Sequence, residues 1–224
     1  ATVTICCMTI PVYAAELTPN PNPSGHTIEV TGSDTFSKEI PFHNNGKINI
    51  LNGGTLTTNY SLPLLTNPLM NYSGSTLNIF AGGTLVNEGA TEVYSGATLT
   101  NNKGGTINNS LWFVILSSST TNNYGTINNL DSHPSGWLGD IVIGGSSSIG
   151  GDAGTAIFNN YGTINNSSYI LIAYSPTLFN SAFYNSGTLN NYGVMDNDAL
   201  INNNSGAVIN NTPGSTINNT GTLN

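Results

Sequence analysis

The sequence predicts an all-β fold, a parallel β-helix formed by one chain, with about 20–22 residues per turn and three short strands in each turn. One phrase, Gly-Thr-Ile/Leu-Asn-Asn, recurs along the chain, as is typical of a stack of nearly identical units. Its full copies lie at Gly105–Asn109, Gly125–Asn129, Gly162–Asn166 and Gly187–Asn191. The 224 residues include 36 asparagines and 26 glycines, and both residue types are weak helix formers.

The period of the repeat follows from the apolar residue at the centre of each unit. Two quartets each span 22 residues in steps of 6 or 8: Leu77, Leu85, Val93 and Leu99, and Met195, Ile201, Ile209 and Ile217. Leu56 and Leu77 lie 21 residues apart, which places them one turn apart. Residues 44–224 then allow about eight turns, a rod on the order of 40 Å long at the usual spacing of paired strands.

Each unit alternates between apolar and polar residues, so the central Ile or Leu is expected to point inward and its neighbours outward. Glycine is expected at the corners because a corner often needs a positive φ. The last asparagine of each phrase is expected to turn the corner, since asparagine tolerates the left-handed conformation. Equivalent corner asparagines would then hydrogen-bond along the stack as a structural ladder. These are Asn109, Asn129, Asn166 and Asn191.

The N-terminal residues 1–15 are apolar and uncharged, and they resemble a secretory signal peptide that ends in small residues. The alternative is a retained strand that docks on the same or a neighbouring subunit. Both interpretations place the protein outside the cytoplasm. Cys6 and Cys7 cannot easily pair with each other, but in a retained segment they would cross-link subunits in an oxidising compartment.

Residues 16–43, with four prolines, are expected to form a linker and an N-terminal cap that includes a strand at 27–31. The solenoid follows over 44–224, with insertions near 110–121, 130–158 and 167–183. The continuous apolar runs 111–116 and 169–174 are expected to cover a solenoid face or form a subunit contact. The repeat continues to Asn224, so either the sequence is a fragment or the open end meets another copy.

Composition excludes several classes of function. The net charge is −8, only 6% of the residues are charged, and all three basic residues are lysines. Such a chain lacks the basic stripe that nucleic-acid binding requires. Beyond the N-terminal segment, no stretch is long and apolar enough to span a membrane. We expect no cofactor and no metal, because the three histidines are scattered.

An enzyme is not expected, although β-helices host polysaccharide lyases and glycosidases. Glycoside hydrolysis needs two placed carboxylates. The candidates are Asp196 and Asp198, which alternate on one strand face, and Asp131, Asp140 and Asp152 in an insertion. Solvated carboxylates on a rod are the simpler interpretation. Lyases that resemble the pectate-cleaving group use an arginine base, and this chain has no arginine.

The phrase Asn-Asn-Tyr-Gly-Thr-Ile-Asn-Asn, at Asn122–Asn129 and Asn159–Asn166, resembles the Asn/Gly-rich repeats of secreted microbial β-solenoid surface proteins. These include adhesin-like regions and sheath-forming or filament-forming proteins. The resemblance covers residues 44–224 and implies an extracellular structural or adhesive role, with no catalytic motif.

The expected function is therefore a self-assembling extracellular structural protein, a subunit of a filament, sheath or surface layer. One alternative is an adhesin-like rod that binds glycans or a surface. The others are a polysaccharide-active enzyme and an ice-binding solenoid. The last is suggested by outward Thr-x-Asn pairs such as Thr106 and Asn108, but the pattern recurs on several faces and the turn lengths vary.

Overall fold

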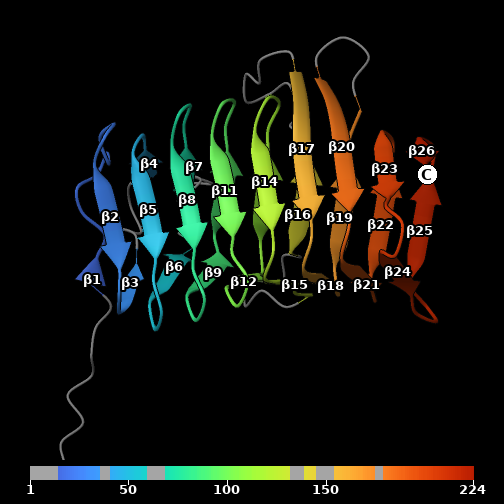
Figure 1. Cartoon of the computed structure of the whole chain (residues 1–224), viewed down its shortest axis with the longest axis horizontal. Coiled ribbons are helices and arrows are strands. Elements are labelled where there is room, and N and C mark those ends of the chain that lie inside the picture. Colours follow the sequence, from blue (N-terminus) through green and yellow to red (C-terminus); the bar gives the residue numbers. More distant parts are fainter. Residues whose placement is uncertain (1–14, 36–40, 60–68, 132–138, 145–153, 175–178) are drawn as a thin grey trace, which may run out of the picture.

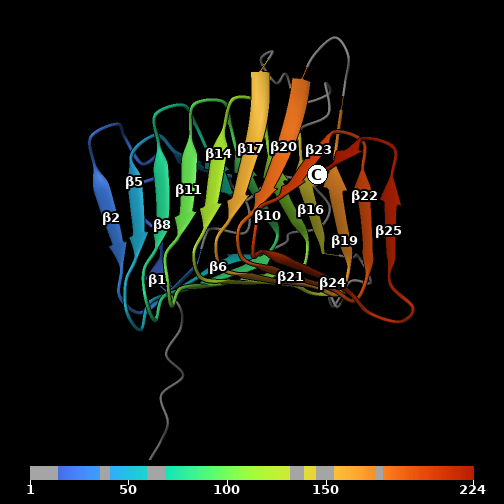
Figure 2. The same cartoon turned by 45° about the vertical axis from the view of Figure 1, so that its right-hand side comes forward.

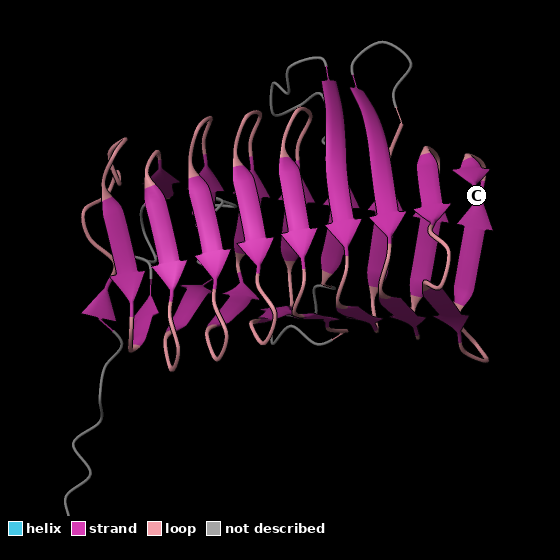
Figure 3. Cartoon of the chain, in the orientation of Figure 1, coloured by secondary structure: helices cyan, strands magenta, loops and turns pink. Residues whose placement is uncertain are grey.

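The fold is known from a computed structural model that describes residues 15–35, 41–59, 69–131, 139–144, 154–174 and 179–224. Within these ranges the chain consists of strands, turns and bends and contains no helix (Figure 3). Cys6, Cys7 and all but the last residue of the segment that resembles a signal peptide lie outside the described residues.

The described residues form twenty-six strands in three sheets, which we name sheets A, B and C. Sheet A contains β1 (Ala15–Glu16), β3 (Ser33–Thr35), β6 (Thr55–Asn59), β9 (Thr84–Glu88), β12 (Thr106–Asn109), β15 (Thr126–Asn129), β18 (Thr163–Asn166), β21 (Thr188–Asn191) and β24 (Val208–Asn211). Sheet B contains β4 (Phe42–Asn44), β7 (Leu69–Asn71), β10 (Ala90–Val93), β13 (Trp112–Ile115), β16 (Asp140–Ile143), β19 (Tyr169–Ile172), β22 (Val194–Asn197) and β25 (Thr216–Asn219). Sheet C contains β2 (Thr27–Val30), β5 (Lys47–Ile50), β8 (Thr76–Ile79), β11 (Thr98–Asn101), β14 (Thr120–Asn123), β17 (Gly154–Asn160), β20 (Phe179–Asn185), β23 (Leu200–Asn203) and β26 (Thr222–Leu223).

From β2 onward the chain visits sheets C, A and B in turn, and each strand from β2 to β23 pairs in parallel with the strand three places later, whereas β1 pairs with β3. This confirms the predicted parallel β-helix with three strands per turn. The result is a rod whose three sheets form the sides of a prism, with sheet C facing the viewer and sheet A forming the floor (Figures 1 and 2). β17 and β20, each seven residues long, extend beyond their neighbours.

The core is a set of apolar columns inside the prism. In β12 the burial pattern alternates, so that Ile107 and Asn109 point inward while Thr106 and Asn108 point outward. Ile107 pairs with Leu85 below and Ile127 above, and all three side chains are fully buried. Stacking identical residues in register buries each one against its copies, which explains why the repeat conserves the position and size of the central residue along the rod.

Residues 15–35 contribute β1, β2 and β3 to the sheets, so the solenoid begins within the segment expected to be a linker and cap. The apolar runs at 111–116 and 169–174 contain β13 and β19, which are regular strands of sheet B. Leu56 pairs with Leu85 rather than standing one turn from Leu77, because the chain between β6 and β7 is longer than the connection between β9 and β10 in the next turn. The unit sequences are too alike to reveal this shift.

The glycines of the recurring phrase serve a purpose different from the one expected. A positive φ occurs at glycines of other corners, including Gly82 and Gly104. It does not occur at Gly125, Gly162 or Gly187. At these positions the turn below passes so close that a Cβ on Gly162 would lie 2.1 Å from the carbonyl oxygen of Gly125. The phrase therefore requires glycine because the backbones of successive turns touch at this corner.

Gly162→Ala should lower the free energy of unfolding by about 3 kcal/mol or more, because the new methyl group can be accommodated only by separating two backbones. Denaturant unfolding followed by circular dichroism measures the change.

Gly32→Ala is the matched control, since a Cβ there meets nothing within 4 Å and φ is not positive. It should change the stability by less than about 0.5 kcal/mol. Equal losses in the two variants would contradict the close contact between turns.

Candidate functional site

A row of buried asparagine side chains runs along the corner where sheet A meets sheet B, and we name it ladder A. Each amide donates from Nδ2 to Oδ1 of its neighbour one turn later, at 2.6–2.8 Å. The Oγ1 of Thr58 donates to the first amide. Ladder A consists of Asn87, Asn109, Asn129, Asn166, Asn191 and Asn211. It includes all four asparagines for which the sequence predicts a ladder.

Each interior member of ladder A has its hydrogen-bonding groups satisfied. Asn129, which is fully buried, accepts a bond from Asn109 and donates to Oδ1 of Asn166 at 2.7 Å. Its second N–H donates to the backbone carbonyl of Tyr169, at the start of β19, at 3.1 Å. One side chain therefore links three turns and fixes where the chain enters sheet B. Both donors of the amide are used, so burial carries no uncompensated polar group.

The corner asparagines differ from the prediction in their backbone. They are the last residues of strands, their side chains point inward, and none has a positive φ. Among described residues other than glycine, only Ser118 has a positive φ. The left-handed conformation was therefore the wrong reason for asparagine here. The residue is needed because an inward amide can bond both along the stack and across the corner.

Similar rows occupy the other two corners. Ladder C, between sheets C and A, has spacings of 2.7–2.8 Å and consists of Asn101, Asn123, Asn160, Asn185 and Asn203. The row between sheets B and C is interrupted. It begins with Asn22, Asn44 and Asn71, continues with buried Val93, Ile115, Ile143 and Ile172, and ends with Asn197 and Asn219. An inward corner position therefore accepts either an amide or an aliphatic side chain, provided that the row stays in register.

A further asparagine row lies on the outside of sheet A. The sequence predicted these outward positions as part of the Thr-x-Asn pairs, but not the hydrogen bonds along the row. Each amide donates to the Oδ1 of the preceding turn at 2.9 Å, opposite to the direction in ladder A. The row consists of Asn108, Asn128, Asn165, Asn190 and Asn210. The signal was present in the first asparagine of each Asn-Asn pair, which the predicted alternation already placed outside.

The outer face of sheet A is built from few residue types and is nearly free of charge. Beside the outer asparagines runs a threonine row in register across six strands: Thr55, Thr84, Thr106, Thr126, Thr163 and Thr188. Among the outward side chains of β6 to β24 in the described sheet, Glu88 is the only charged one. We call this surface the Thr/Asn face.

At the C-terminal turn, formed by β23 to β26, the inside of the prism is open. A cavity of about 350 Å³ is lined there by Met195, Ile201, Asn203, Ile209, Ile217, Leu223 and Asn224. Asn203, Asn211 and Asn219 close the three amide rows at this turn, and their Nδ2 atoms bond locally, for example Asn211 to the carbonyl of Ser215. The turn thus presents apolar and amide groups that match the interior of the stack.

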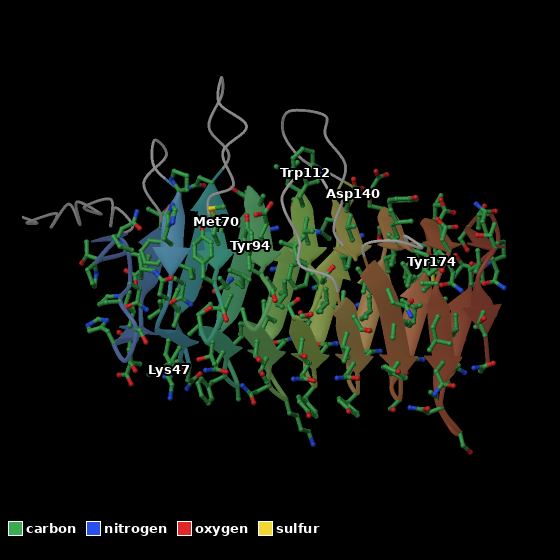
Figure 4. The ribbon with its side chains drawn as sticks, turned by 90° about the horizontal axis from the view of Figure 1, so that it is seen from above. Lys47, Met70, Tyr94, Trp112, Asp140 and Tyr174 are labelled. Carbon is green, nitrogen blue, oxygen red and sulfur yellow. The ribbon has the colours of Figure 1, made fainter. Side chains whose placement is uncertain are left out.

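The outer face of sheet B differs from the Thr/Asn face because it is aromatic and acidic. Met70, Tyr94, Trp112 and Asp140 lie along one long side of the rod, and Lys47 lies on the opposite side (Figure 4). The rings of His43, Tyr72 and Tyr94 stack with centroid separations of 5.4 and 4.9 Å. Burial, and then a hydrogen bond with the buried Glu92, raises the pKa of Tyr94.

Of the candidate carboxylates, Asp196 and Asp198 are held by separate sets of hydrogen bonds. Asp196 accepts from the Tyr169 hydroxyl and from Nδ2 of Asn218, both at 2.7 Å. Asp198 accepts from Oγ1 of Thr220 at 2.5 Å. Each is thus held by its own neighbours in adjacent turns. Asp131 is exposed, and Asp152 lies outside the described residues. The described residues contain no group of three His, Cys, Asp or Glu side chains that would hold a metal ion.

Asp140 and Tyr169 are neighbours in register at the start of β16 and β19. Burial raises the pKa of Asp140 to about 6. The pKa of Tyr169 is also raised, first by burial and then by its hydrogen bond to Asp196. The carboxyl group of Asp140 and the hydroxyl group of Tyr169 therefore stay protonated at a higher pH than usual, because burial removes part of the water that would solvate their charged forms.

In the part of the chain that the structure describes, no helix has the length and apolarity needed to cross a membrane. Comparison with protein families, with curated proteins and with solved structures gave no match. The geometry of the rod is therefore the ground for any functional proposal.

Asn129→Ala should lower the free energy of unfolding by about 4 kcal/mol, because it leaves an N–H of Asn109, Oδ1 of Asn166 and the Tyr169 carbonyl buried without their partner. Asn128→Ala, at the adjacent outward position, should cost less than about 1 kcal/mol, since water replaces the lost bonds. Denaturant unfolding of the two variants measures the difference. Similar losses of unfolding free energy would show that the inner row contributes no more to stability than the outer row.

The raised pKa of Asp140 predicts a pH-dependent stability. The folded state binds the proton more tightly than the unfolded state, so the free energy of unfolding should fall as pH rises from about 4 to about 6. The full shift corresponds to about 3 kcal/mol. Because the side chain is only half-buried, we expect a loss on the order of 1 kcal/mol. Asp140→Asn should remove this loss, and urea unfolding of both proteins at pH 4 and pH 7 measures the difference. A pH dependence identical in the two proteins would be the contrary result.

Proposed function

We propose that this chain is an extracellular structural protein, a self-assembling subunit of a filament, sheath or surface layer. The observation that carries the proposal is the Thr/Asn face, a regular and almost uncharged sheet surface that extends from β6 to β24. Flat sheets with repeated side chains and little charge pack against one another with few specific contacts, and stacked amides strengthen such assemblies.

Side-by-side packing of two rods through this face meets little electrostatic resistance. The outward side chains from β12 to β21 are threonine and asparagine alone, each repeated at the strand spacing. A second copy presents the same grid, so its threonines and asparagines meet equivalent groups at the same spacing. Charged outward residues would block this approach, as they do at the edges of monomeric sheets.

End-to-end contact is the second mode of assembly that we propose. The C-terminal turn presents Ile209, Ile217 and Leu223 together with the edges of β24, β25 and β26. A solenoid turn with the same pattern would bury these side chains and continue the backbone pairing. Such a turn can come from further residues of the same polypeptide or from a second copy stacked end to end.

The extracellular location rests on the resemblance of residues 1–15 to a signal peptide and of the repeats to secreted microbial surface proteins.

Negative-stain electron microscopy of the natively purified protein tests the proposal. We expect ordered fibres, tubes or sheets in which rods lie side by side. Loss of this order on adding a reductant would assign Cys6 and Cys7 to intersubunit disulfides. Monodisperse short rods with and without reductant would contradict assembly.

Thr126→Lys tests the Thr/Asn face itself. The substitution places a charge at the centre of the face and should reduce the assembled fraction, measured by sedimentation, at least about tenfold if each contact loses 1.4 kcal/mol or more. Thr100→Lys, at an outward position of β11 on sheet C, is the matched control and should assemble like the parent protein. Normal assembly of Thr126→Lys would show that another surface joins the rods.

A further inference from the structure

A cavity of about 480 Å³ opens at the corner between sheets A and B, where three successive turns meet the start of β16, β19 and β22. It is lined by Asp131, Asp140, Ser168, Tyr169, Tyr192 and Val194, together with Ser167 and Gly193. Its volume lies within the range of small-molecule sites, roughly 300–1,000 Å³. Neither the assembly surfaces nor the ladders use these outward groups.

The cavity combines a flat apolar surface with hydrogen-bonding groups. The side chain of Tyr192 is 53% exposed, so its ring is available to a ligand. Tyr169 is held in place, because its hydroxyl donates to Asp196 at 2.7 Å. Asp131 and Asp140 add carboxylate oxygens, which accept hydrogen bonds from hydroxyl groups.

Ser168 lines the same cavity and carries a buried hydroxyl group. Its side chain is 7% exposed, and its Oγ has no hydrogen-bond partner. A buried hydroxyl without a partner is costly, and native proteins seldom leave one unexplained. Because the Oγ has almost no accessible surface, it meets a ligand only after the Ser168 side chain rotates toward the cavity that the residue lines.

We propose that this cavity binds a neutral pyranose sugar. Such a sugar has hydroxyl groups that donate to the carboxylates and meet Ser168, and a C–H face that packs against the ring of Tyr192. Asp131, Asp140 and the neighbouring Asp196 disfavour an anionic sugar, as does the net charge of −8. The proposal does not depend on assembly, because a single rod contains every residue of the cavity.

Saturation-transfer difference NMR tests the site, with the methyl pyranosides of glucose, galactose and mannose as neutral probes and methyl glucuronide as the anionic counterpart. We expect signal transfer to at least one neutral probe and a much weaker transfer to the glucuronide. The absence of transfer to all three neutral probes, or equal transfer to the glucuronide, would overturn the proposal.

Two substitutions locate the binding. Tyr192→Ala removes the stacking surface, and Ser168→Ala removes the orphan hydroxyl with little risk to folding. Each should weaken binding of the neutral probe about tenfold, the effect of losing one good contact. Tyr161→Ala is the matched control, since Tyr161 is 47% exposed at a different corner and stacks on Tyr124 instead.

Circular dichroism first verifies that each variant keeps its strands. Affinity that is unchanged in both Tyr192→Ala and Ser168→Ala, or lowered equally by Tyr161→Ala, would show that the sugar binds elsewhere and would refute the assignment. Assembly in the electron microscope is read separately, so a failure of one proposal leaves the other standing.

Discussion

The rest of the structure depends on one constraint, that a buried amide must have hydrogen-bond partners. An asparagine that points into the prism finds its acceptor in the asparagine of the next turn, and this works only when successive turns stack in register. Ladder A and ladder C impose that register at two corners. Where the third corner changes from amides to Val93 and Ile115, the packed apolar side chains keep successive turns in register instead.

The same stacking explains where the structure tolerates no variation. At Gly125, Gly162 and Gly187 the backbones of neighbouring turns approach so closely that any side chain would separate the rungs of the ladders. A corner row in which an asparagine follows an aliphatic side chain leaves a buried amide group without one of its partners. Asn101 stands above Ile79 in sheet C, and its Oδ1 has no partner, whereas its Nδ2 continues the ladder upward. Long unbroken rows avoid this cost at every rung except the first.

Much of this architecture could be predicted from the sequence, because the period, the alternation and the recurring phrase all concern local pattern. The assignment of each unit to a sheet could not be predicted wherever the connection length changes. Leu56 was matched to Leu77 although it stacks on Leu85. The role of Gly162 required knowledge of the adjacent turn, which the phrase alone does not contain. The cavity was beyond sequence reasoning for the same reason, since Asp131, Ser168 and Tyr192 lie in three different turns.

The inner and outer asparagine rows of sheet A together determine how their side-chain dipoles add along the axis of the rod. In ladder A the amides donate toward the C-terminal turn, and in the outer row they donate toward the N-terminal turn. The side-chain dipoles of the two rows therefore oppose each other along the axis. Because they largely cancel, these rows give a neighbouring rod no electrostatic reason to prefer the same or the opposite orientation.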